Sequence, residues 1–388
     1  MHVCLVTLDF PPFRGSGLTI YAEKVVKGLV ACGHRVTVLA AQRPESERAE
    51  APDLPPEVRV LRFDVGRADW IALGWQAARF LRGCSHEFDV VHFADVHFAY
   101  AYRQPYLATG HQSFRQRLSS HGGRTYHGNR RNLVFRTLYY STAYRAMERP
   151  AVRRAHHMVM VSQTTQQEFV AEYGLSPRRT TVVYTGIDLD RFEGAPGQAV
   201  ARATLGLIDD LPVLLYIGFS TPRKGVEYLA QALGRMQSPA QLVMVGKWEK
   251  GYRERFLAAL GAQRERVRIT GYVPDAGLLD YYAAADIFVL PSLLEGFGIP
   301  LVEAMAAGVP VLTTSGSAAE EIAGEAGLIV PRADDLALAQ ALDRLLAQPE
   351  LRKRMSEAGR ERARSLFDQR RMTAHMDALY HRVLAELR

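Results

Sequence analysis

Short apolar runs alternate with helical patterns along almost the whole chain. Strand-like runs in the first half include HVCLVTL, RVTVLA and DVVHF, and those in the second half include PVLLYIG, QLVMVG and DIFVLP. Helical patterns lie between most of them, for example in residues 19–31, 224–236 and 336–347. Such β–α–β repetition predicts an α/β fold with parallel sheets and helices on both faces. Because ligands bind at the carboxyl ends of parallel strands, the loops that follow the strands should carry the site.

The length of the chain predicts two domains. Its 388 residues are enough for two domains of ordinary size, each with a core of its own. Turn-forming and small polar residues become denser in residues 191–212, so we place the interdomain linker there. The predicted domains are residues 1–195 and residues 205–367.

The composition is ordinary for a globular protein in water, with 48% hydrophobic and 23% charged residues. The cysteines, Cys4, Cys32 and Cys84, form neither a disulfide framework nor a zinc pattern, which favours a reducing cytosol. The segment MHVCLVTLDFPPF lacks a basic start, so we read it as a first strand and not as a signal peptide. No apolar run approaches membrane-spanning length. We therefore expect a cytoplasmic protein.

The positive charge of the chain is concentrated in residues 112–156, which we call the basic window. This window holds ten arginines and a single acid, Glu148, a net charge of +9 in a chain whose total is +7. One interpretation is contact with an anionic binding partner or with the inner, anionic face of a membrane, since apolar side chains accompany the arginines. The other is a solvated basic face. No nucleic-acid motif accompanies the charge, so we expect no nucleic-acid partner. The arginines are 115, 117, 124, 130, 131, 136, 145, 149, 153 and 154, and the apolar residues are Leu133, Val134, Phe135, Leu138 and Tyr139.

The most informative motif is PSLLEGFGIPLVEAMAAGVPV, residues 291–311. It places Glu295 and Glu303 eight positions apart, with glycines between them and a helix predicted to begin near Ile299 and Pro300. N–H groups at such a helix start suit a phosphate, and the carboxylates suit sugar hydroxyls. The alternatives are a Glu303 that only complements the helix dipole and a Glu295 that is a solvated loop carboxylate.

With Gly-Phe-Gly, Glu-Ala-Met-Ala and Gly-Val-Pro in place, this Glu-x7-Glu segment resembles the donor-site signature of retaining GT-B glycosyltransferases, in particular glycosyltransferase family 4. The resemblance implies two Rossmann-like domains that face each other across a cleft. It also implies that the last helix, residues 368–388, crosses back to the N-terminal domain. The C-terminal domain would bind a nucleotide sugar, and the N-terminal domain would bind the acceptor.

The resemblance also implies roles for single residues of this motif. Glu303 would accept hydrogen bonds from the ribose hydroxyls of the nucleotide. Glu295 would lie near the donor sugar, as a hydroxyl contact, an electrostatic stabiliser or a nucleophile, and we favour the hydroxyl contact. Backbone amides would hold the sugar hydroxyls at Gly296, Phe297 and Gly298 and would face the diphosphate at Ile299 and Leu301.

The segment YIGFSTPRKGVEYLAQAL supplies cations after a predicted strand. Many family members carry an Arg where this chain has Phe219, but the adjacent Arg223 and Lys224 resemble a Pro-Arg-Lys variant of the family. The resemblance implies that this pair neutralises the diphosphate leaving group. The alternative, a solvated basic helix start, is disfavoured because cations oppose the helix dipole there.

Four further residues match the family more loosely. Gly15 and Gly17 resemble the glycine-rich loop after the first strand, where the second glycine approaches the donor phosphate. His111 matches a family histidine that reaches the donor sugar, although a lone histidine is more often structural. The backbone around Tyr272 would meet the nucleotide base.

We therefore predict a retaining hexosyltransferase that uses a nucleotide-diphosphate sugar, a UDP- or GDP-sugar being our expectation, and an acceptor hydroxyl. No metal site and no cofactor are expected, because Arg223 and Lys224 supply positive charge. The rivals are a GT-B nucleotide-sugar epimerase or phosphorylase, and a catalytically silent nucleotide-sugar-binding subunit. The phosphorylase would need a pyridoxal-binding lysine region in a much longer chain.

Overall fold

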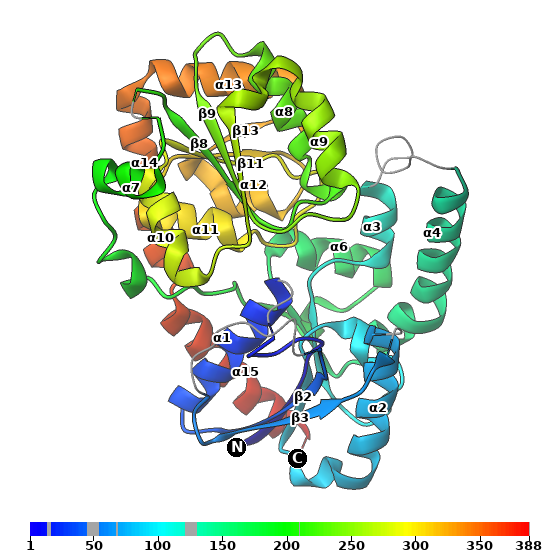
Figure 1. Ribbon diagram of the computed structural model, residues 1–388. Coiled ribbons are helices and arrows are strands. Elements are labelled where there is room, and N and C mark those ends of the chain that lie inside the picture. Colours follow the sequence, from blue (N-terminus) through cyan, green and yellow to red (C-terminus); the bar gives the residue numbers. More distant parts are fainter. Residues whose placement is uncertain (14–16, 45–53, 67–68, 121–129, 209, 388) are drawn as a thin grey trace. The chain divides into compact units, whose positions relative to one another are not determined.

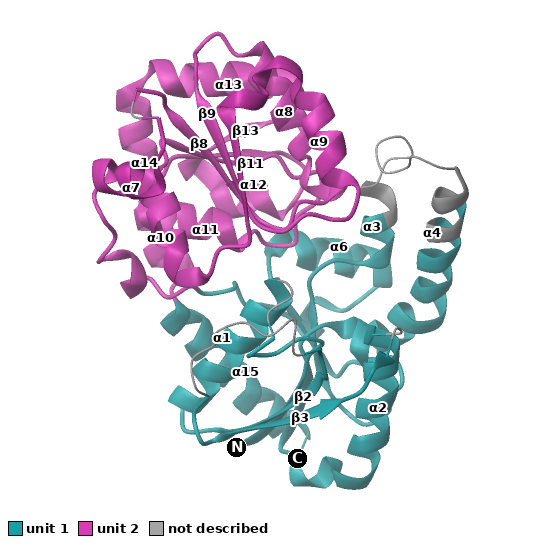
Figure 2. Cartoon of the chain, viewed as in Figure 1, with its two compact units in different colours: residues 1–119, 128–186, 369–388 teal, residues 120–127, 187–368 magenta. Residues whose placement is uncertain are grey.

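The computed structural model describes residues 1–13, 17–44, 54–66, 69–120, 130–208 and 210–387, without the side chains of 118–120, 130–133 and 135–136 (Figure 1). The chain divides into two compact units, each built on a sheet of its own (Figure 2). Unit 1 comprises residues 1–119, 128–186 and 369–388, and unit 2 comprises residues 120–127 and 187–368.

Unit 1 is built on a parallel sheet of seven strands in the order β3-β2-β1-β4-β5-β6-β7. The strand order reverses between β1 and β4, which makes this pair the topological switch point of the sheet. The inner strands are continuous apolar runs because helices cover both faces of a parallel sheet. The strands are β1 (His2–Val6), β2 (Arg35–Ala41), β3 (Val58–Phe63), β4 (Val90–Phe93), β5 (Leu107–Gly110), β6 (His157–Met160) and β7 (Thr180–Val182).

Seven α-helices accompany this sheet in the part of the chain that the structure describes. They are α1 (Gly17–Ala31), α2 (Asp69–Cys84), α3 (Phe114–Ser120), α4 (Arg130–Ala143), α5 (Arg149–Arg154), α6 (Gln163–Tyr173) and α15 (Gln369–Leu387). The last of these packs beside α1, at the opposite end of the sequence (Figure 1).

Unit 2 repeats the same plan with six parallel strands in the order β10-β9-β8-β11-β12-β13. Its switch point lies between β8 and β11. The strands are β8 (Val213–Ile217), β9 (Gln241–Val245), β10 (Val267–Gly271), β11 (Ile287–Leu290), β12 (Val311–Thr314) and β13 (Gly327–Val330). The helices are α7 (Gln198–Leu205), α8 (Val226–Arg235), α9 (Tyr252–Leu260), α10 (Asp275–Ala284), α11 (Ile299–Ala307), α12 (Ala318–Ala323), α13 (Asp335–Ala347) and α14 (Pro349–Leu366).

The two sheets confirm the predicted α/β fold with two Rossmann-like domains. The return of the last helix is confirmed as well, because the chain leaves unit 2 at Asp368 and α15 belongs to unit 1. No helix among the described residues is both long enough and apolar enough to cross a bilayer.

The change of unit falls between Gly186 and Ile187, before the segment 191–212 in which we placed the linker. That segment contains α7, which packs on α10. Arg202 of α7 donates to Asp286 at 2.5 Å and to the carbonyl of Ala284 at 3.1 Å. The small and turn-forming residues therefore begin unit 2 and do not form a free linker.

Candidate active site

The loops that follow β8 and β11 meet at the switch point of unit 2. The amides of Leu293 and Leu294 both donate to the carbonyl of Arg223, at 2.8 and 3.3 Å. Gly225 permits this approach: its φ is +62°, and a Cβ there would lie 2.1 Å from the carbonyl oxygen of Pro291. A side chain at Gly225 would therefore push the two loops apart.

These loops place two cations against Glu295. Lys224 Nζ is ion-paired with Oε2 of Glu295, and Ser292 Oγ donates to the same oxygen at 3.1 Å. Arg223 Nη1 lies 3.8 Å from Oε1 of Glu295. Burial favours the neutral form of Glu295, but Lys224 and Arg223 outweigh it and hold its pKa below the ordinary value. Burial also lowers the pKa of Lys224, and the charge of Glu295 opposes this shift.

Arg223 and Lys224 lie on a short 3-10 turn, Pro222–Lys224, and α8 begins only after Gly225. From the sequence we had expected both cations at the start of that helix. The two side chains differ in exposure, since 30% of the Arg223 side chain and 9% of the Lys224 side chain are exposed. Arg223 is therefore the cation that faces solvent, and Lys224 is the buried partner of Glu295.

Glu303 lies in α11, buried, with a partner at each oxygen. Arg191 donates to Oε1 at 3.1 Å, and Tyr282 donates to Oε2 at 2.8 Å. Burial, with the nearby charge of Glu303, raises the pKa of Tyr282 well above its ordinary value, so the phenol keeps its proton. A carboxylate has about four acceptor positions, so Glu303 can accept further hydrogen bonds from a ligand.

The start of α11 agrees with the prediction from Ile299 and Pro300. Gly298 precedes the helix with a φ of +96°, which favours glycine, and a Cβ there would lie 3.4 Å from Cγ of Glu295. The amide of Leu301 donates to the carbonyl of Gly298 at 2.9 Å. This is the amide that we predicted to face the diphosphate, and in the structure it has an acceptor within the chain. Gly296 and Phe297 lie in the same loop, between the two acids.

Tyr272 and Phe219 also follow strands of unit 2, and both side chains are exposed. The ring centroid of Tyr272 lies 5.1 Å from Nζ of Lys247, a cation–π distance. A large exposed aromatic ring at the carboxyl edge of a parallel sheet is suited to stacking against a planar ligand.

The remaining predicted site residues belong to unit 1. Gly15 lies outside the described residues, and Gly17 is the exposed first residue of α1. His111 follows β5 and donates from Nε2 to the carbonyl of Ala94 at 2.9 Å. Burial lowers the pKa of His111, so the ring is neutral at pH 7. Its Nδ1 is then an acceptor, suited to a hydroxyl donor.

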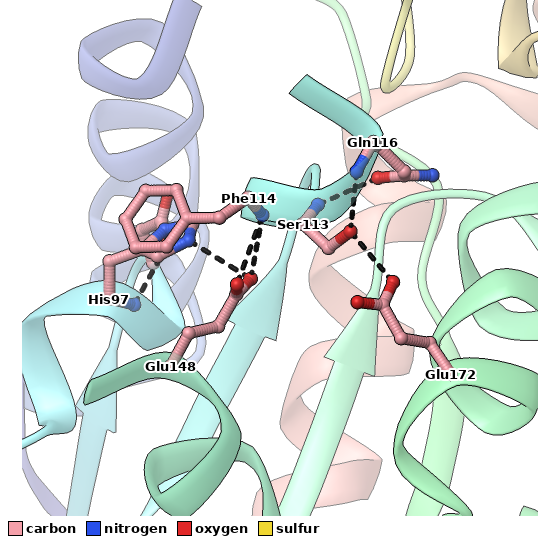
Figure 3. Close-up of polar contacts among 7 residues, drawn as sticks. His97, Ser113, Phe114, Gln116, Glu148 and Glu172 are labelled. Atoms are coloured by element: carbon pink, nitrogen blue, oxygen red, sulfur yellow. Dashed lines mark hydrogen bonds and ion pairs between the residues drawn. The ribbon is translucent and has the colours of Figure 1, made fainter. Parts of the chain in front are cut away.

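A buried charged network lies at the same edge of the unit 1 sheet (Figure 3), and its Asp95 and His97 interact electrostatically with His111. His97 contacts Oδ1 of Asp95 through Nδ1 and lies 3.1 Å from Oε1 of Glu148 through Nε2. Glu148 is fully buried and accepts the amide hydrogen of Phe114 at 3.1 and 3.0 Å. Burial alone would lower the pKa of His97, but Asp95 and Glu148 raise it to about 9. Glu148, the only acid of the basic window, is therefore buried and has its partners inside unit 1.

The start of α3 is fixed by a second set of contacts in Figure 3. Ser113 N donates to Oε1 of Gln116 at 2.6 Å, and Gln116 N donates to Oγ of Ser113 at 3.0 Å. This reciprocal pair is a capping box. Ser113 Oγ also donates to Glu172 at 2.8 Å. The first turn of the basic window is therefore held by carboxylates of the chain itself.

Several of these residues were not predicted from the sequence. Arg191 and Tyr282 contact Glu303 from segments far from the motif, and Arg191 lies in the stretch we had read as linker. Ser292 was visible inside the motif, three residues before Glu295. Asp95 and His97 showed no pattern of their own beyond following a strand.

Known proteins resemble both halves of the chain. The family model described as Glycosyltransferase Family 4 matches residues 15–191, and that described as Glycosyl transferases group 1 matches residues 198–362. An uncharacterised glycosyltransferase of Methanocaldococcus jannaschii is 29% identical over 369 residues, 89% of each chain.

Solved structures share the fold over the full length. Sucrose-phosphate synthase of Thermosynechococcus elongatus has a TM-score of 0.79 at 22% identity, over 99% of each chain. The Anabaena protein HepE, in a complex with UDP-glucose, has a TM-score of 0.74 at 17% identity, over 98% of this chain and 99% of its own. The two matched family models and the two switch-point sheets lead to one conclusion: the chain belongs to the family 4 glycosyltransferases of the GT-B fold.

Proposed function

We propose that this glycosyltransferase moves a hexose from a nucleotide-diphosphate sugar, a UDP- or GDP-sugar, to an acceptor hydroxyl and retains the configuration of the anomeric carbon. The observation that carries the proposal is the cluster of Arg223, Lys224 and Glu295 at the switch point of unit 2. The UDP-glucose held by HepE supports a nucleotide sugar as the donor.

The two cations would stabilise the diphosphate as it leaves. Negative charge develops on the phosphate when the glycosidic bond breaks, and fixed positive charges aimed at it lower the barrier. Arg223 donates to the carbonyl of Leu294 at 3.3 Å, which fixes the guanidinium while most of its five donors stay available. The proposal needs neither a metal nor a cofactor, because Arg223 and Lys224 supply this charge.

Glu295 would hold the donor sugar and would not attack it. Its two oxygens share Lys224, Ser292 and Arg223, and a carboxylate neutralised in this way is a weak nucleophile. The same carboxylate can still accept a hydrogen bond from a sugar hydroxyl. Glu303, held by Arg191 and Tyr282, would accept the ribose hydroxyls.

Retention follows when the acceptor attacks the face of the sugar that the phosphate leaves. The bond to the departing phosphate breaks first, through an oxocarbenium-like state. The acceptor hydroxyl then attacks from the same face and gives its proton to the departing phosphate. His111 would offer Nδ1 to a sugar hydroxyl, since its Nε2 donates to Ala94.

The basic window would engage an anionic acceptor or an anionic membrane surface. Arg115, Arg145, Arg149 and Arg153 have exposed side chains. On α4, Val134 and Leu138 are 66% and 65% exposed, unusual values for aliphatic residues. Exposed apolar side chains among arginines are typical of binding at a membrane surface.

A panel of nucleotides tests the donor. Thermal unfolding is followed with UDP, GDP, ADP and TDP, because a ligand that binds the folded state raises the melting temperature. We expect UDP or GDP to raise it most, and we expect the corresponding sugar nucleotide to be turned over. The control variant Glu325→Ala, altered at an exposed acid of unit 2, should respond to the nucleotides as the unaltered protein does.

Two outcomes would contradict the proposal. Stabilisation by a nucleotide without any transfer or hydrolysis of its sugar would favour the silent binding subunit. Inversion at the anomeric carbon of the product, observed by NMR, would overturn the retaining mechanism.

A further inference from the structure

A second group of ligand-type side chains lies in unit 1 and joins the turn between α1 and β2 to α15. Helices α1 and α15 pack side by side there (Figure 1). His34 comes from the turn, and Asp377 and His381 are one helical turn apart on α15. One ligand atom from each residue lies within 4.8 Å of the other two. His34 and Asp377 are 343 positions apart in sequence, so no spacing motif could reveal this group.

The distances within this group are close to those of a metal site. Nε2 of His34 lies 2.5 Å from Oδ1 of Asp377, and Nε2 of His381 lies 3.6 Å from the same oxygen. In a tetrahedral zinc site with bonds of about 2.0–2.1 Å, ligand atoms stand about 3.3 Å apart. Small side-chain rotations would therefore bring all three atoms to one ion.

The burial of the three side chains suits a site that opens to solvent on one side. His34 is 6% exposed, and its Nδ1 faces the Met1 amine at 3.2 Å, which turns Nε2 toward Asp377. The side chains of Asp377 and His381 are 30% and 62% exposed. An ion could enter from the outer face of α15, and water would fill its open coordination position.

We propose that His34, Asp377 and His381 bind a divalent transition metal ion that fastens α15 to the turn between α1 and β2. Two imidazoles and one carboxylate suit Zn²⁺, Co²⁺ or Ni²⁺, whereas Mg²⁺ and Ca²⁺ prefer oxygen ligands. The ligands come from the two ends of the chain of unit 1. The ion would therefore stabilise the folded unit, since the unfolded chain does not hold these groups together.

Any test must distinguish metal binding by these three side chains from metal binding by a neighbouring thiol. Cys32 is exposed and precedes His34 by two residues. A site that depends on His381 is distinguished from binding to the thiol alone by removing His381 and leaving Cys32 in place.

The experiment uses the full chain without a histidine tag, stripped with EDTA and returned to chelator-free buffer. Zn²⁺ binding is measured by calorimetry, and Co²⁺ binding by visible absorption. We expect one ion per chain and a higher melting temperature that EDTA reverses. We expect His381→Ala and Asp377→Asn to weaken binding by about tenfold or more, the loss typical of perturbed metal sites.

The matched control is His375→Ala, which removes an exposed histidine of α15 that is not part of the group. It should bind the ion as the unaltered protein does. Thermal unfolding without metal shows whether each variant is folded, which we expect because His381 is exposed. The proposal is overturned if the unaltered protein binds no Zn²⁺ or Co²⁺, or if His381→Ala binds them with unchanged affinity.

Discussion

Arg223 and Lys224 are adjacent in sequence, but their surroundings differ. Lys224 is buried against Glu295, so Lys224→Ala would leave a buried carboxylate without its main partner and would cost stability. Arg223 is more exposed and lies 3.8 Å from Glu295. Removal of Lys224 should therefore lower stability more than removal of Arg223, although the two cations are adjacent in sequence.

We expect Arg223→Ala to lower kcat by about 10²–10³-fold with little change in melting temperature, because the lost donor acts on the transition state. Steady-state kinetics with the preferred sugar nucleotide measure this effect. Lys250→Ala, altered at an exposed cation of the same unit, should keep the full rate. A normal rate for Arg223→Ala would remove its leaving-group role.

Glu303 shows how a site residue is supported by residues that its motif does not contain. We expect Glu303→Ala to weaken nucleotide binding by about tenfold or more, since it removes a charged acceptor of two ribose hydroxyls. Calorimetry with the preferred nucleoside diphosphate measures the loss, and Glu325→Ala is again the control. Unchanged affinity for the nucleotide would mean that Glu303 only bonds to Arg191 and Tyr282 and does not contact the ribose.

At the scale of elements, the network of Asp95, His97 and Glu148 joins the segment that follows β4, the start of α3 and the turn before α5. Three buried ionisable groups are expensive, and each depends on the others for its charge. His97 is the centre of the network, and its pKa of about 9 lies above the ordinary value of 6.5. The folded state therefore holds more protons than the unfolded state between these two values.

The stability from His97 is fully present below pH 6.5 and is lost as the pH rises through about 9, an effect on the order of 3 kcal/mol. Denaturant unfolding across this range measures the decline. In His97→Gln this decline of the free energy of unfolding with pH should be absent, and in His375→Gln it should remain. Equal slopes in the unaltered protein and His97→Gln would contradict a charged His97.

Helix α4 is the element that fits the membrane reading of the basic window. We expect the protein to sediment with anionic vesicles at low salt and to be released as the salt concentration rises, because screening weakens the attraction of the arginines. Replacing Val134 and Leu138 by Asp should abolish the binding. Val200→Asp, at an exposed valine of α7, should not. If the protein does not bind at low salt, the membrane interpretation is wrong. The basic window would then be interpreted as a contact for an anionic acceptor.

At the scale of the whole molecule, α15 completes the core of unit 1 although it comes last in the chain. Tyr380 is fully buried, and its hydroxyl lies 2.5 Å from Nδ1 of His92 in β4. Leu379 is 3% exposed, whereas Leu387 on the same helix is 38% exposed. The core of unit 1 is therefore built from residues far apart in the chain.

We expect Leu379→Ala to lower the free energy of unfolding by about 2–5 kcal/mol through the cavity that it leaves. Leu387→Ala should change it by less than about 0.5 kcal/mol. Denaturant unfolding of both variants makes the comparison. Equal effects would show that α15 is not part of the core.

The sequence alone determined the fold class, the glycosyltransferase family and the donor motif with its helix start at Ile299, because periodicity and local turn chemistry are written in neighbouring residues. The tertiary structure decided what distant segments do together. Arg191 and Tyr282 against Glu303, Glu148 against His97, and His34 beside Asp377 are contacts between residues far apart in the chain. The structure places residues 191–212, where we predicted the linker, within unit 2. The sequence could not show this, since small polar residues look alike in a linker and in a helix that packs on its own unit.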